Sequence, residues 1–96
     1  MSIYLITRDQ FELVRPLLED FRRKTRPRRH DLYDILCAIL YREHHHLKWR
    51  ALPAEFPPWR TVHEYSHQWS MPPRAGGAPP METVRATLAP YLKEKT

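Results

Sequence analysis

The chain has 96 residues, of which 42% are hydrophobic, and it carries a formal net charge of +5. This length allows one small domain at most, whose core we expect to be rich in aromatic residues. A single cysteine, Cys37, excludes an internal disulfide, and because no stretch resembles a signal peptide or a membrane span we expect a cytoplasmic protein.

The first predicted helix begins after Thr7, because Thr7 and Gln10 have the spacing of a capping box. Pro16 lies inside this segment and should bend or shorten the helix. Hydrophobic residues at helical spacing predict one apolar face, which consists of Phe11, Val14, Leu17, Leu18 and Phe21.

A basic arm follows this helix. Six of the eight residues from 22 to 29 are cationic and none is acidic: Arg22, Arg23, Lys24, Arg26, Arg28 and Arg29. The rest of the chain holds ten basic and eleven acidic residues, so the whole positive excess lies in this arm. Such a block is either a solvated loop or an electrostatic contact for a polyanion. We favour the polyanion contact, because Pro27 keeps the arm extended.

The second predicted helix begins at Asp31, a good N-cap residue. Cys37 lies within it without a basic neighbour in sequence, and we interpret it as a structural thiol. Three successive histidines at 44–46 mark the end of the helix, and they cannot converge on one metal ion because consecutive helical residues point about 100° apart. The apolar positions of this helix are Leu32, Ile35, Leu36, Ile39 and Leu40.

Residues 49–69, which are rich in tryptophan and proline, predict a helix-turn-helix. Trp49 and Leu52 fit a short helix that ends before the next proline, and Phe56 would fill the gap between the two helices. Pro58 suits the first position of the second helix, because its missing N–H costs nothing there. In this geometry the second helix can enter the major groove of DNA.

The second helix of this unit has two contrasting faces. One face is largely apolar and should lie against the core: Trp59, Val62, Ser66 and Trp69. The other is free to contact a ligand and includes Arg60, Thr61, Glu64, Tyr65 and Gln68. We assign all three tryptophans to the core rather than to base stacking, because a DNA duplex offers no free base faces.

Residues 71–80 contain four prolines and two glycines, which predicts an exposed linker. The core should therefore end near Trp69, with a DNA-binding domain at 1–70 and a C-terminal helix at 81–96. Pro90 should kink that helix, which either docks on the core or pairs with another chain. Its apolar positions are Met81, Val84, Leu88 and Leu92. Because no strand pattern is visible, we expect an all-α fold.

The tryptophan-proline block occurs together with two shorter patterns. These three pieces are Arg26-Pro27-Arg28, the helix Ile35–Tyr41, and Trp49-Arg50-x-Leu52-Pro53-x-x-Phe56-Pro57-Pro58-Trp59-x-Thr61-Val62 followed by Trp69. Together they resemble the amino-terminal DNA-binding region of DDE-type insertion-sequence transposases. The segment Thr7–Leu18 fits the first helix of that family, so the resemblance covers about residues 6–70. It implies recognition of the terminal inverted repeats of a mobile element.

The resemblance also implies an RNase-H-like catalytic domain with three metal-binding carboxylates further along the polypeptide. The eleven acidic residues here are scattered, without the alternating strands and helices of such a domain. We therefore expect a non-catalytic protein without cofactor or metal: a separate first reading frame, a truncated transposase or a repurposed domain. Its expected partners are double-stranded DNA and either a second copy or a full-length transposase, with no membrane, so the cytoplasmic protein would be associated with the nucleoid.

The second helix of the helix-turn-helix departs from similar proteins, in which the residues after the Thr-Val pair are strongly basic. Affinity would then depend on the basic arm, and specificity on the polar residues of the helix. A glutamate can accept a hydrogen bond from the amino group of cytosine, and an arginine can pair with guanine or phosphate. The predicted DNA-binding residues are Arg22, Arg23, Lys24, Arg26, Arg28, Arg29, Lys48, Arg50, Arg60, Thr61, His63, Glu64, His67 and Gln68.

Two other functions fit parts of the chain. The motif His63-Glu64-x-x-His67 is typical of small zinc metallopeptidases, in which two histidines one turn apart ligate zinc. A third ligand would have to be Glu82 or a histidine of 44–46, and we find no strand against which a peptide could lie. The C-terminal helix, in contrast, suggests a protein-interaction adaptor in which it recruits a partner or closes a homodimer.

Overall fold

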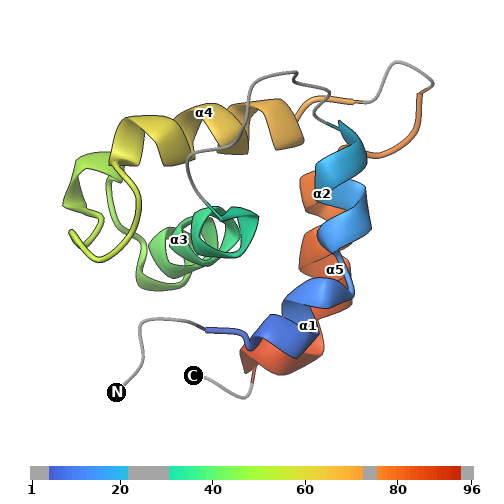
Figure 1. Ribbon diagram of the computed structural model, residues 1–96, viewed down its shortest axis with the longest axis horizontal. Helices are drawn as coiled ribbons and strands as arrows, with labels where there is room; N and C mark the ends of the chain where they lie inside the picture. The colour runs from blue at the N-terminus through green and yellow to red at the C-terminus, as the bar shows by residue number, and fades with distance from the viewer. Residues whose placement is uncertain (1–4, 22–30, 73–75, 94–96) are drawn as a thin grey trace.

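The computed structural model describes residues 5–21, 31–72 and 76–93 (Figure 1). Over these residues the chain is helical and contains no strand, which confirms the predicted all-α fold. The elements are α1 (Arg8–Glu12), α2 (Arg15–Phe21), α3 (Leu32–His45), a single 3-10 turn η1 (Trp49–Ala51), α4 (Trp59–Trp69) and α5 (Pro80–Lys93). None of these helices is both long and apolar enough to cross a lipid bilayer.

The predicted first helix is divided into α1 and α2. The capping box is confirmed, since the Gln10 amide donates to Thr7 Oγ1 at 3.1 Å and the Thr7 amide to Gln10 Oε1 at 2.9 Å. Pro16 lies in the first turn of α2. A backbone N–H at this position would have no acceptor within the helix, so its absence in proline costs no hydrogen bond. The break changes the direction of the chain, so the expected burial of Leu17 is wrong: its side chain is 40% exposed, whereas Phe11, Val14 and Leu18 are buried.

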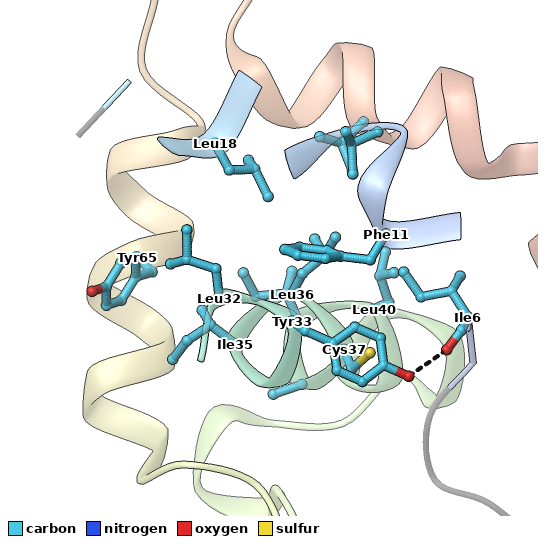
Figure 2. Close-up of a cluster of buried hydrophobic side chains, with 14 of the residues drawn as sticks. Ile6, Phe11, Leu18, Leu32, Tyr33, Ile35, Leu36, Cys37, Leu40 and Tyr65 are labelled. Carbon is cyan, nitrogen blue, oxygen red and sulfur yellow. Dashed lines mark hydrogen bonds between the residues drawn. The ribbon is translucent and has the colours of Figure 1, made fainter. Parts of the chain in front are cut away.

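Helix α3 is the centre of the core. Asp31 caps it as predicted, because its carboxylate accepts from the Tyr33 amide at 2.9 Å. The Tyr33 hydroxyl donates to the carbonyl oxygen of Ile6 at 2.7 Å, which ties the N-terminal segment to this helix (Figure 2). All five predicted apolar positions are buried, and so are its other hydrophobic residues up to Leu40. In Figure 2, side chains of α1 and α2 cover one side of α3 and Tyr65 of α4 another.

Helix α3 ends in a left-handed residue. His46 has φ 55° and ψ 44°, and its amide donates to Glu43 while the Leu47 amide donates back to the carbonyl of Arg42 at 3.0 Å. This pair of bonds is the Schellman arrangement, in which glycine usually occupies the left-handed position. It turns the chain away from α3 and toward η1.

Helix α5 belongs to the same core, which corrects the expectation that the core ends near Trp69. Met81, Val84 and Leu88 are fully buried, and α5 packs against both α2 and α4. The apolar stripe of α5 therefore docks on this chain's own core. In Figure 1, α1 and α2 run alongside α5, while α3, η1 and α4 form the other half of the molecule. Pro90 lies within α5, which continues to Lys93.

Candidate nucleic-acid interface

Helix α4 begins where the sequence predicts, with one difference in detail. Pro58 has φ −53° and ψ 140° and lies just before the helix, so that Trp59 is the first helical residue. The expected short helix at Trp49–Leu52 is only the 3-10 turn η1, which is shorter than the first helix of a helix-turn-helix unit. Phe56 is buried as expected, with its ring 5.4 Å from that of Tyr41. The helix-turn-helix interpretation therefore stays a proposal.

The outer face of α4 consists of polar side chains that point away from the core. Arg60, His63, Glu64 and His67 are exposed, and Thr61 and Gln68 are half-buried. The opposite face is anchored, because Val62, Tyr65 and Trp69 are buried. We call the six polar residues the α4 outer face. A rigid helix with one anchored face can present the other to a groove.

Tyr65 does not lie on this outer face, although it was expected there. Its side chain is 8% exposed, and its ring packs 5.2 Å from that of Trp69. Ser66, which was expected to face the core, is half-buried. The reason is that α4 packs against both α3 and α5, so its buried arc is centred on Val62, Tyr65 and Trp69.

The three tryptophans have different environments. Trp69 is fully buried, as predicted, and Trp49 is half-buried against the core. Trp59 is half-buried and is not part of the core cluster, so the assignment of this residue to the core is wrong. It stands at the first position of α4, before the arc that faces α3 and α5.

Trp49 and Trp59 form a surface cluster with cationic side chains. The guanidinium carbon of Arg42 lies 4.2 Å from the ring centroid of Trp49. Those of Arg50 and Arg60 lie 5.6 and 5.5 Å from the ring centroid of Trp59. At these distances each pair makes a cation–π contact.

His63 connects the two halves of this cluster. Its imidazole meets Trp49 edge-on, with ring centroids 5.1 Å apart, and Trp59 at 6.5 Å. The Trp49–Trp59 cluster, as we call it, comprises Arg42, Trp49, Arg50, Trp59, Arg60 and His63. It brings three of the predicted DNA-binding residues together.

The predicted site residues are only partly covered by the structure. Lys48, which is exposed, directly precedes η1 and therefore stands beside the cluster in sequence. The six cations of the basic arm lie outside the described residues. Arg42 was not predicted, because it is seven residues before Trp49 and only the turn at His46 brings the two together.

The structure also places the residues of the metallopeptidase hypothesis. His63 and His67 are exposed one turn apart on α4. Within the described ranges, no group of three or more His, Cys, Asp or Glu side chains could hold a metal ion. The histidines near the end of α3 contact other rings instead, since His45 lies 4.3 Å from Tyr41 and 4.8 Å from His44. The motif therefore lacks a third protein ligand in this part of the chain.

Cys37 is fully buried in α3. Burial raises the pKa of its thiol to about 12, because the apolar surroundings disfavour the thiolate. A thiol that stays protonated at neutral pH is a poor nucleophile, which supports the structural role assigned to it.

Comparison with known proteins gives one match. A family model described as "Putative transposase of IS4/5 family" matches residues 6–73, which is more than half of the chain. The matched segment contains α1 to α4 and ends before α5. No curated protein and no solved structure matches the chain.

Proposed function

We propose that this chain, which belongs to the IS4/5 family of transposases, binds double-stranded DNA sequence-specifically through the α4 outer face. Its role is transposase-related, and the proposed ligand is the terminal repeat of a mobile element. We propose no strand cleavage by this segment. A protein with this segment could then either guide a catalytic partner to the repeat or compete with a full-length transposase for it.

The observation that carries this proposal is the two-sided character of α4. Its inner face is fixed by Val62, Tyr65 and Trp69, while the four most outward side chains are all polar or charged. The major groove of DNA admits an α-helix and displays donors and acceptors that distinguish the base pairs. Protein contacts to phosphates position such a helix, and contacts to base edges provide the specificity.

We assign different tasks to the two sets of residues. Glu64 and His63 would contact base edges, and Arg60 would contact guanine or phosphate. Lys48 and Arg50, together with the basic arm at 22–29, would contact phosphates. If the arm neutralises about five phosphates, the logarithm of the binding constant should fall against the logarithm of the salt concentration with a slope of about −4.5.

The structure gives less support to the other two hypotheses. The stripe of α5 that suggested an adaptor is occupied, since Met81, Val84 and Leu88 are buried in the chain's own core. The zinc hypothesis needs a third ligand, and the described residues provide no group of three. Titration of the tag-free protein with zinc tests this second point, because stoichiometric binding that is lost in His67→Ala would restore the peptidase hypothesis.

Selection of bound duplexes from a random pool tests the proposed function. We expect one enriched sequence, bound at physiological salt at least about a thousandfold more tightly than a scrambled duplex. Removal of the charges of the basic arm should weaken the binding of all sequences alike. A pool without enrichment, from protein shown to be folded, would contradict sequence-specific binding.

A further inference from the structure

Arg42 has no part in the proposed function, although its side chain belongs to the Trp49–Trp59 cluster. It lies in the last turn of α3 and is half-buried. Among the residues that the structure describes, its Nε is buried and has no hydrogen-bond partner. The neighbouring carboxylate of Glu43 is engaged elsewhere, since it pairs with Arg85 at 2.6 Å. The guanidinium carbon of Arg42 lies 4.2 Å from the ring centroid of Trp49.

A continuous series of contacts leads from Arg42 to the α4 outer face. Trp49 meets Arg42 and also meets the imidazole of His63 edge-on, with ring centroids 5.1 Å apart. Trp59 approaches the same imidazole at an angle of 82° between the ring planes. His63 is therefore an exposed side chain held between two indoles, one of which is fixed to α3 by Arg42.

We infer that Arg42 is a positioning residue for DNA recognition, which acts through Trp49 to hold the His63 ring in place for an acceptor on a base edge, such as N7 of guanine. This inference rests on the proposed function. An imidazole N–H can donate one hydrogen bond to such an acceptor. A side chain that is already held loses little conformational freedom on binding, so the contact contributes more to affinity for the correct sequence.

The effect of Arg42 on the free protein is tested by NMR spectra of the His63 ring. Arg42→Met keeps a long apolar stem and removes the cation. We expect the His63 ring protons to move toward the shifts of an unfolded chain in this variant and to stay close to the wild-type shifts in Arg42→Lys. Arg85→Met is the matched control, because it removes an arginine that contacts α3 through Glu43 rather than through Trp49. Unchanged His63 shifts in Arg42→Met would overturn the inference.

The effect on recognition is tested with the selected duplex and a duplex altered at one base pair. We expect Arg42→Met to reduce the ratio of the two affinities about three- to tenfold, without changing the affinity for random DNA or the salt slope. A uniform loss with a slope smaller by about one would instead make Arg42 a phosphate contact and overturn the inference.

Two controls keep these results interpretable. Thermal melting of each variant establishes that it is folded, and Arg42→Gln repeats both comparisons if Arg42→Met does not fold. Failure of the wild type to distinguish the two duplexes contradicts the proposed function. Discrimination by the wild type that Arg42→Met retains contradicts this inference alone.

Discussion

Arg85 of α5 binds Glu43 of α3 through two contacts, Nη2 to Oε2 at 2.6 Å and Nε to Oε1 at 3.2 Å. The pair joins a helix outside the matched family segment to the central helix inside it. Being partly exposed, the ion pair itself contributes little to stability. The two contacts do, however, define the position of α5 along α3.

Removal of α5 should unfold or strongly destabilise the domain. A chain that ends at Ser70 lacks Met81, Val84 and Leu88, which are fully buried. Burial of each such side chain contributes about 1.5–3 kcal/mol, so the loss approaches the whole stability of a small domain. Urea unfolding followed by circular dichroism compares the two chains. Equal unfolding midpoints would show that α5 is dispensable for the core.

Alanine substitution should cost more stability at Trp69 than at Trp59. Trp69→Ala should cost about 3–5 kcal/mol, because it empties a fully buried site. Trp59→Ala should cost about 1–2 kcal/mol, since the side chain is half-buried outside the core cluster. Chemical denaturation gives both values. Similar losses for the two variants would contradict the environments described for them.

His46→Gly should stabilise the protein by about 1 kcal/mol, because glycine adopts the left-handed conformation without the steric cost of a side chain. His46 has φ 55° and is exposed, so no buried contact is lost. His46→Ala is the matched control: it removes the imidazole and retains the strain, and should leave the melting temperature nearly unchanged. A gain in both variants would assign the effect to the imidazole.

Cys37 should make stability fall at alkaline pH. Burial raises the pKa of its thiol to about 12, so above the ordinary pKa near 9 the folded chain holds a proton that the unfolded chain loses. The contribution of the thiol to the free energy of unfolding is therefore complete below pH 9 and declines as the pH rises, by at most about 1.4 kcal/mol per pH unit. Between pH 8 and pH 10, the urea concentration at the unfolding midpoint should fall further for the wild type than for Cys37→Ala. Parallel declines would contradict this account.

Features governed by neighbours in sequence were predictable here. The caps at Thr7 and Asp31 and the buried face of α3 depend on spacing within one helix, and all are confirmed. Leu17 and Tyr65 were misplaced because their burial depends on how separate helices cross. The regular spacing of Trp59, Val62 and Trp69 could not reveal that α4 leaves Trp59 outside the core, because its buried arc depends on how α4 packs against α3 and α5.

The candidate site shows the same limit. The outward direction of Arg60 and Glu64 followed from helical periodicity, and the structure agrees. The contact between Arg42 and Trp49 could not be predicted, because it requires the left-handed turn at His46 and the 3-10 turn that follows. The three histidines indicated the end of the helix but not its left-handed conformation, since the left-handed residue is not a glycine.

The most direct test of sequence reading by the α4 outer face is Glu64→Gln, measured on the selected duplex and on duplexes changed one base pair at a time. We expect this variant to lose about 1–3 kcal/mol of discrimination at one C·G pair, without weaker binding to random DNA, because a negative charge has left the proposed interface. Glu82→Gln, an exposed glutamate on α5, should leave the base preferences unchanged. Base preferences that are the same in Glu64→Gln, Glu82→Gln and the wild type would contradict base contact by Glu64 and undermine sequence reading by the α4 outer face.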